Sequence, residues 1–307
     1  MNIQDENLQI RLGRFKILKK YSLVLAESYK RLGKERKYVR VKDCGTFLEF
    51  KKYENGQTIL SGANFCRDRL CPQCAKRRSL KVFGQLSKVI NDLKQYDYDY
   101  IFITLTLRNC RRCDLDYTLN NLSLGFKKFI NTKYFRNKLF LGCFRSTEVT
   151  RNKKQDTFHP HLHLLVAVKK DYFKKTNKNY VKKEDLIKIW KRCLQIDYNP
   201  VCDIRAVKNK EKVSFEVSKY ITKGSDFLYK DDGKTTDELV QLLSVALHSK
   251  RFISYVGCFF KSRQKLRLQD KDIDKNINID EIENCSELAY IIHKFRWSFG
   301  FSGYEEF

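Results

Sequence analysis

Hydrophobic and polar positions in residues 100–207 follow two different periods. Four short runs rich in β-branched and aromatic residues predict strands: 100–107 (YIFITLTL), 141–150 (LGCFRSTEVT), 161–168 (HLHLLVAV) and 201–207 (VCDIRAV). Between them, residues 119–130 and 184–194 place apolar side chains at helical spacing. The resulting order, βαββαβ, is that of the split βαβ or ferredoxin-like arrangement, whose first and third strands are neighbours at the centre of the sheet.

The flanking segments predict further elements of both kinds. We expect helices at residues 21–32, 75–96, 212–223 and 237–247, and strands at 41–53 and 251–260. The charged stretch 268–284 is expected to be a loop. The predicted class is therefore α+β, with an antiparallel sheet core and a helical or irregular C-terminal extension. We expect three parts: a basic, Cys-rich segment with an amphipathic helix (1–96), the sheet domain (97–264) and a tail (265–307).

Composition supports a folded, nucleic-acid-binding protein. The 307 residues are 42% hydrophobic, which is ample for a core and excludes a wholly disordered chain. The net charge of +26 favours a polyanionic partner, above all nucleic acid. The competing interpretation of this charge is that all proteins of the source organism are rich in Lys. With no apolar run near 18 residues and no signal-peptide pattern at the start, we expect a cytoplasmic protein without a membrane partner.

The strongest candidate for chemistry is a histidine cluster. Three of the five histidines are His159, His161 and His163. Alternate residues of a strand share a face, so His161 and His163 form half of a metal site. Glu148, on the preceding strand, is a candidate third ligand, and His159 competes with it. Two imidazoles and one carboxylate leave coordination positions on a metal ion open for a phosphate. Such a ligand set suits Mg²⁺ or Mn²⁺, although Zn²⁺ fits too.

A second candidate lies on the helix predicted at 212–223. Glu216 and Tyr220 are four residues apart and therefore share a helix face, with Lys223 on the same side. The phenol of tyrosine has a pKa of about 10, so it is a poor nucleophile at neutral pH. A nearby ammonium or metal ion would favour the more reactive phenolate. Taken alone, the pattern fits an ordinary helix with an exposed tyrosine, because the chain has 17 tyrosines.

Cysteine spacing predicts a structural metal site. The eleven cysteines, an odd number in a chain without a secretory signal, disfavour disulfides and favour metal binding or burial. Cys66, Cys71 and Cys74, with Cys44 upstream, have the spacing of a closed four-thiolate zinc site. The pair Cys110 and Cys113 also has ligand spacing, and its role stays open. Basic residues beside this segment are candidate DNA contacts or a solvated helix face: Arg67, Arg69, Lys76, Arg77 and Arg78.

Together these motifs resemble the replication initiator (Rep) proteins of rolling-circle plasmids, within the HUH endonuclease superfamily. FITLTL (102–107) is similar to the first family motif, HPHLHLL (159–165) to the metal-binding second, and SKYITK (218–223) to the third, which carries the nicking tyrosine. CGTFLEF and ANFCRDRLCPQCAKRRS resemble the N-terminal Cys segment. The resemblance covers roughly residues 40–260.

The resemblance implies a tyrosine-dependent, metal-dependent nicking endonuclease. Tyr220 would attack the scissile phosphate of single-stranded origin DNA, leaving a 5′-phosphotyrosine and a 3′-OH that primes synthesis. Glu216 would assist termination, and Lys223 would neutralise phosphate or phenolate charge. Origin DNA, double-stranded and extruded, is the expected partner, together with host helicase and polymerase; an oligomer is possible in this family. The alternatives are a relaxase or single-strand transposase, and a zinc-dependent DNA-binding regulator without catalysis.

Overall fold

The computed structural model describes residues 3–137, 139–170, 172–173, 180–207, 237–269 and 288–307. Contacts divide the chain into two compact units. The first comprises Met1–Lys81, Leu228–Ser244 and Asp270–Phe307, and the second Val82–Phe227 and Val245–Gln269. The domain boundaries at residues 96 and 264 stay predictions. Among the described residues, no helix combines the length and apolarity needed to cross a bilayer.

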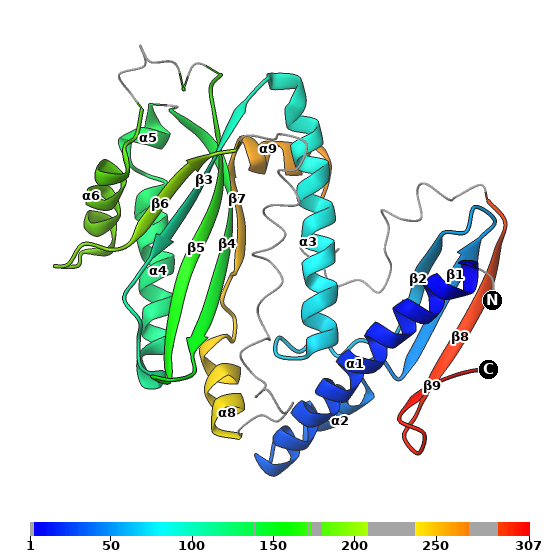
Figure 1. Ribbon diagram of the computed structural model, residues 1–307. Helices are drawn as coiled ribbons and strands as arrows, with labels where there is room; N and C mark the ends of the chain where they lie inside the picture. Colours follow the sequence, from blue (N-terminus) through cyan, green and yellow to red (C-terminus); the bar gives the residue numbers. More distant parts are fainter. Residues whose placement is uncertain (1–2, 138, 171, 174–179, 208–236, 270–287) are drawn as a thin grey trace. The chain divides into compact units, whose positions relative to one another are not determined.

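The first unit combines helices with an antiparallel sheet (Figure 1). Its elements are α1 (Ile3–Arg31), α2 (Glu35–Asp43), β1 (Phe47–Tyr53), β2 (Thr58–Ala63), the start of α3 (Pro72–Leu93), most of α8 (Asp237–Ala246), β8 (Tyr290–Ser298) and β9 (Gly303–Glu306). The strand order is β2-β1-β8-β9. Leu48, Phe50, Leu60 and Phe295 on these strands are buried in one core with Leu8 and Leu12 of α1.

Three elements of this unit differ from the sequence-based expectation. The helix expected at 21–32 is the end of the much longer α1. Residues 41–43, expected to begin a strand, end α2 instead, and β1 starts at Phe47. The C-terminal extension, expected to be helical or irregular, contains β8 and β9. β8 was missed because its apolar residues Tyr290, Ile291 and Ile292 are consecutive and largely exposed, so they do not alternate.

The second unit confirms the ferredoxin-like topology. Its elements are the rest of α3, η1 (Lys94–Tyr96), β3 (Asp99–Thr106), η2 (Arg112–Asp114), α4 (Leu115–Phe129), α5 (Lys133–Arg136), β4 (Phe140–Asn152), β5 (Thr157–Val168), α6 (Lys183–Leu194), β6 (Cys202–Ala206), β7 (Ile253–Gly257) and α9 (Cys258–Lys265). The strand order is β6-β3-β5-β4-β7, with every neighbouring pair antiparallel. β3 and β5, the first and third strands, are neighbours as predicted.

Helices α4 and α6 cover one face of this sheet (Figure 1). Alternate residues of the strands, such as Ile103 and Leu164, pack with Phe126 of α4 and Trp190 of α6. The indole of Trp190 is fully buried and donates a hydrogen bond of 2.8 Å to the carbonyl of Thr106. These residues form the hydrophobic core of the second unit. The other alternate set, which includes the histidines at 161 and 163, faces away from it.

The strand expected at 251–260 is shorter than predicted. β7 ends at Gly257, where φ is +61°, and α9 begins at Cys258. A Cβ on Gly257 would lie 2.4 Å from the carbonyl oxygen of Leu141, so the turn requires glycine on both conformational and steric grounds. The helix expected at 212–223, with Glu216, Tyr220 and Lys223, lies outside the described residues, as does most of the loop expected at 268–284.

Candidate metal centres and basic groove

Two neighbouring strands bring a carboxylate and two imidazoles together. In the register of β4 and β5, Glu148 lies directly opposite His161, and Ser146 opposite His163. Oε2 of Glu148 is 3.2 Å from Nε2 of His161 and 3.0 Å from Nε2 of His163. All three side chains are less than a tenth exposed. The three ligand atoms lie within 4.8 Å of one another, so this group could hold a metal ion.

The hydrogen bonds behind the imidazoles orient their Nε2 atoms towards Glu148. Nδ1 of His161 is 2.9 Å from the carbonyl oxygen of His159, which can only accept a hydrogen bond, so Nδ1 carries a proton. Nδ1 of His163 is 3.3 Å from the hydroxyl of Thr104 on β3. Nε2 of His161 can therefore donate to the carboxylate only in the protonated, cationic imidazole, whereas in the neutral form it presents a lone pair to the carboxylate. A cation between them would turn this repulsion into coordination.

The donor set and its spacing fit a divalent ion. Neighbouring ligands about 2.1 Å from an octahedral ion lie about 3.0 Å apart, whereas a tetrahedral ion would separate them by about 3.4 Å. The observed separation of 3.0 Å matches the octahedral value, and that of 3.2 Å lies midway between the two, so the distances fit either geometry. Burial raises the pKa of the Glu148 carboxyl, but hydrogen bonds and charge from His161 and His163 lower it to about 2. Glu148 is thus ionised, the form that binds metal.

His159 occupies a different position from the other two histidines. It lies opposite Thr150, two residues beyond Glu148, and its ring centroid is 5.1 Å from that of His161. Burial, and to a smaller extent the neighbouring His161, lower the pKa of His159. Its ligand atoms do not belong to the group that includes Glu148. Of the two candidates for the third ligand, the geometry therefore favours Glu148.

The four predicted cysteines converge in the first unit. Cys44, Cys66, Cys71 and Cys74 are buried, and their sulfur atoms lie within 4.8 Å of one another. The distance between sulfurs is 3.6 Å for Cys44–Cys74, 3.5 Å for Cys66–Cys74 and 3.5 Å for Cys71–Cys44. Sulfurs about 2.3 Å from a tetrahedral zinc ion lie about 3.8 Å apart. The residues present thus fit a closed four-thiolate site.

Backbone and side-chain donors surround these sulfurs. The N–H groups of Arg67 and Asp68 donate to the sulfurs of Cys74 and Cys66 at 3.2 and 3.4 Å. Arg67 has a φ of +60°, which turns the chain back over the cluster. The hydroxyl of Ser22 on α1 is 3.4 Å from the sulfur of Cys71. Such donors stabilise the charge of metal-bound thiolates.

Lys19 lies fully buried beside the same cluster, a feature that sequence analysis missed. Its ammonium donates a hydrogen bond of 2.8 Å to the carbonyl of Cys44 and a second to the carbonyl of Lys42. Burial lowers the pKa of Lys19 to about 8, against the opposing effect of the neighbouring thiols. Four thiolates around a divalent ion have a net charge of −2, so this ammonium offsets part of it. Position 19 falls on a helix, without a motif to mark it.

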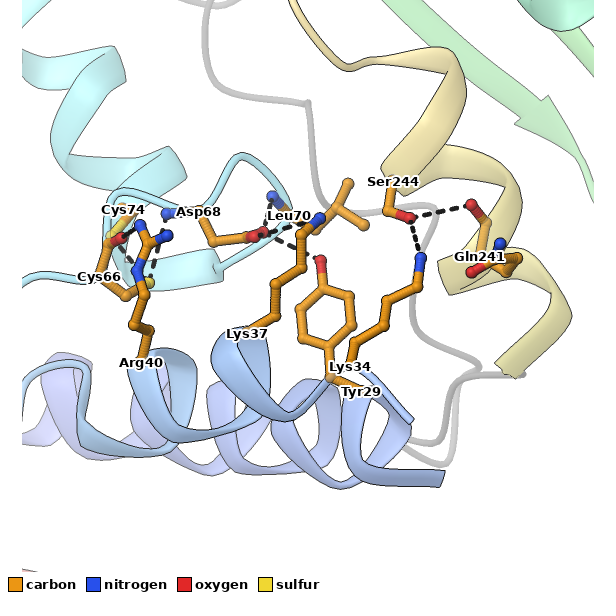
Figure 2. Close-up of polar contacts among 10 residues, drawn as sticks. All are labelled: Tyr29, Lys34, Lys37, Arg40, Cys66, Asp68, Leu70, Cys74, Gln241 and Ser244. Atoms are coloured by element: carbon orange, nitrogen blue, oxygen red, sulfur yellow. Dashed lines mark hydrogen bonds and ion pairs between the residues drawn. The ribbon is translucent and has the colours of Figure 1, made fainter. Parts of the chain in front are cut away.

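Helices α1 and α2 hold the loop that contains Cys66 (Figure 2). Asp68 accepts hydrogen bonds from the hydroxyl of Tyr29 at 3.2 Å and from the N–H of Leu70 at 2.9 Å, and Lys37 lies 3.8 Å from its other oxygen. Arg40 of α2 donates to the carbonyl of Cys66. These contacts fix the loop against the two helices, which orients its cysteine for coordination.

The basic residues predicted to contact DNA separate into two groups. Lys76 and Arg77 line a groove of about 610 Å³ with Arg11 and Arg14 of α1. Its walls include Phe15 and Phe65, and the guanidinium of Arg77 lies 4.7 Å from the centroid of the Phe65 ring. The remaining predicted contacts, Arg67, Arg69 and Arg78, do not line this groove. Arg11 and Arg14 were not predicted, because the sequence does not show that α1 packs beside α3.

The predicted cysteine pair does not form a metal site in the described residues. Cys110 is buried and Cys113 exposed, and neither belongs to a group that could hold an ion. Cys110 instead exchanges two backbone hydrogen bonds of 2.8 Å with Phe158, which anchors its loop to the start of β5.

We expect loss of one thiolate to release the structural metal. In Cys71→Ser, bound zinc should fall from about one ion per chain towards zero, because three remaining thiolates no longer close the site. The unfolding midpoint should fall by about 10 °C or more, as expected for a loss of several kcal/mol. Metal analysis and thermal unfolding measure both. Cys193→Ser, at a buried cysteine outside the cluster, should keep its zinc; normal zinc content in Cys71→Ser would refute the assignment.

The fold and the two clusters define a class: a strongly basic α+β protein with a ferredoxin-like sheet and two groups that could each bind a metal ion, one of a carboxylate and two imidazoles and one of four cysteines. Comparison with known proteins narrows this class to one family. The chain belongs to the replication protein family, whose model matches residues 57–304. The resemblance to plasmid rolling-circle replication initiators is thereby confirmed.

Similar proteins come from several bacteria. The chain is 34% identical to a Rep protein of Bacillus amyloliquefaciens over 293 residues, which covers 86% of this chain and 85% of the relative. It is 31% identical to a Rep protein of Streptococcus pneumoniae over 314 residues, with 96% of each chain covered. A Rep protein of Lactiplantibacillus plantarum is 32% identical over 278 residues, with 86% of each covered. No solved structure matches the chain.

Proposed function

We propose that this replication initiator nicks plasmid origin DNA through Tyr220, in a metal-dependent reaction on single-stranded DNA. The observation that carries the proposal is the convergence of Glu148, His161 and His163 on one buried point of the β4–β5 pair. Membership of the replication protein family supports it. A divalent cation held there would polarise the scissile phosphate and stabilise the charge that develops on it.

The reaction follows from the roles assigned to this chain's residues. The phenolic oxygen of Tyr220 loses its proton and forms a bond to the phosphorus, while the bond from phosphorus to the 3′-oxygen breaks. That oxygen takes up a proton and becomes the 3′-OH from which synthesis starts. The 5′ end remains linked to the enzyme as a phosphotyrosine, which conserves the energy of the broken bond for rejoining.

Two other residues of the predicted helix 212–223 have supporting roles in this proposal. Glu216, one helical turn before Tyr220, serves as a general base at termination by activating a water or a second attacking hydroxyl. Lys223 neutralises charge on the phosphate or on the phenolate. Both residues share the predicted face of Tyr220, so they would reach the same phosphate.

Origin duplex is proposed to bind the first unit. The groove lined by Arg11, Arg14, Lys76 and Arg77 combines cations with apolar and aromatic walls, and the four-thiolate cluster holds the adjoining loop in place. Phosphate contacts from such cations supply affinity that falls as the salt concentration rises. Host helicase and polymerase would then act at the nicked origin.

The test is a nicking assay with full-length protein, single-stranded origin oligonucleotides and Mn²⁺ or Mg²⁺. We expect cleavage at one position, its loss with EDTA, and a covalent protein–DNA adduct that mass spectrometry maps to Tyr220. A non-catalytic regulator would bind the same DNA without cleaving it. Binding without cleavage in either metal, with the zinc site loaded, would therefore refute the proposed activity.

A further inference from the structure

A second cavity lies in the sheet unit, on the face opposite to the carboxylate–imidazole cluster. It has a volume of about 530 Å³ and is formed by α4, β4, β7 and the segment that precedes β7. Arg145 and Thr147 of β4 line it, whereas Ser146 and Glu148, which alternate with them, face the other side. The cavity is therefore separate from the proposed nicking site, and the inference does not rest on that proposal.

The floor of this cavity contains a buried arginine. Arg145 is only 3% exposed, and its guanidinium lies 4.8 Å from the centroid of the Phe126 ring. One terminal nitrogen donates to the carbonyl of Arg251, but Nε has no hydrogen-bond partner among the described residues. Burial lowers its pKa to about 10, so it stays charged at neutral pH. Arg145 has no ion pair among the described residues, and burying a charge without a counter-ion is costly, so a bound anion would relieve this cost.

A hydroxyl beside it also lacks a partner. Ser254 of β7 is the cross-strand register partner of Arg145, and its buried Oγ forms no hydrogen bond within the described part of the chain. Three further cations line the cavity, Lys127, Lys250 and Arg251, and the described lining includes no carboxylate. Lys250 already forms an ion pair of 2.8 Å with Asp116, which does not line the cavity. The donors that the site offers to an anion are therefore Arg145 and Ser254, and Lys127 and Arg251 add positive charge.

We propose that this cavity binds a terminal phosphate, with a mononucleotide as the class of ligand. A phosphate monoester has enough oxygens to accept from both Arg145 and Ser254. The volume lies within the usual range for small organic ligands and far exceeds a bare ion. Apolar walls from Leu122, Phe126 and Phe252 suit a nucleoside. The guanidinium of Arg145 is nearly inaccessible. A terminal phosphate can reach it more easily than a phosphodiester inside a nucleic-acid strand, which has nucleotides on both sides.

The test is calorimetric titration of the full-length, zinc-loaded protein with dAMP, inorganic phosphate, deoxyadenosine, and a short oligonucleotide with or without a 5′-phosphate. We expect one dAMP per chain, and at least tenfold weaker binding to Arg145→Met. Ser254→Ala, which removes only an unpaired hydroxyl, should fold normally and bind about threefold more weakly. Arg108→Met is the matched control, because this arginine also lies over an aromatic ring, 3.8 Å from the Tyr198 centroid, but outside the cavity.

The other ligands in this titration identify the source of the phosphate. Displacement of dAMP only by the 5′-phosphorylated oligonucleotide would assign the site to a DNA end, while displacement by inorganic phosphate would show that the anion dominates; both support a phosphate site. Equal affinity for deoxyadenosine would refute it. So would dAMP binding that survives in Arg145→Met and Ser254→Ala but disappears in His163→Ala, because the ligand would then occupy the other centre.

Discussion

Tyr220→Phe is expected to abolish origin cleavage and covalent adduct formation together. The substitution keeps the ring and deletes only the hydroxyl, so folding should survive, while the cleavage rate should fall by at least about 10⁴-fold because no nucleophile remains. Affinity for the oligonucleotide should stay within about threefold, since phosphate contacts from cations dominate it. Gel-based cleavage, adduct mass spectrometry and a binding titration measure the three quantities.

Controls separate this nucleophile from other tyrosines. Tyr117→Phe, at a tyrosine that is 68% exposed on α4, should cut normally. Glu216→Ala should retain the first nick but lose efficient release or termination, because it deletes a base and not the nucleophile. An adduct that persists in Tyr220→Phe would overturn the assignment.

Loss of a metal-binding imidazole should have an effect of similar size. His161→Ala and His163→Ala are each expected to lower the metal-dependent cleavage rate by at least about 10³-fold, since two remaining ligands hold the cation poorly and the charge on the phosphate is no longer stabilised. DNA affinity should change little. Mn²⁺ titration and the cleavage assay test both statements.

Two more variants decide the third ligand. Glu148→Ala should lose Mn²⁺ binding as completely as His163→Ala, whereas His159→Ala should keep most of it, because His159 lies outside the convergent group. His248→Ala, at an exposed histidine beside Ser249, should behave as the unmodified protein. Normal cleavage in either His161→Ala or His163→Ala would place the metal site elsewhere.

The sheet of the second unit was predictable because its periodicity is local. Each strand and helix of the βαββαβ series has enough apolar residues at the spacing typical of a strand or of a helix to be identified from sequence. The topology then follows from the order of these elements. α1 was underestimated because its many charged residues obscure the stripe that includes Leu8 and Leu12. The terminal strand β8 was missed because its pairing partner, β1, is remote in sequence.

In the candidate sites too, features set by neighbouring residues could be predicted, whereas features set by contacts between remote segments could not. The pairing of His161 with His163 follows from the two-residue period of a strand, and the choice of Glu148 follows from the neighbouring hairpin. The orienting contact of Thr104 with His163 depends on the register of β3 against β5, which no local pattern specifies. Arg145 looked like an ordinary strand residue in sequence. Only the packing of α4 and β7 reveals that it is buried, with no carboxylate partner in the part of the chain that the structure describes.

The pairing of β1 with β8 has a consequence for the order in which the first unit folds. Phe47 pairs with Arg296, about 250 positions later, so this sheet closes a very long loop, whereas the four cysteines span a short contiguous stretch. Contacts between sequence neighbours form sooner than contacts across such a separation. During synthesis the four-cysteine cluster can thus assemble early, while one edge of β1 stays without its β8 partner until the second unit has been made. An unpaired strand edge is open to association with another chain, so this interval is when the nascent protein is most exposed to misassembly.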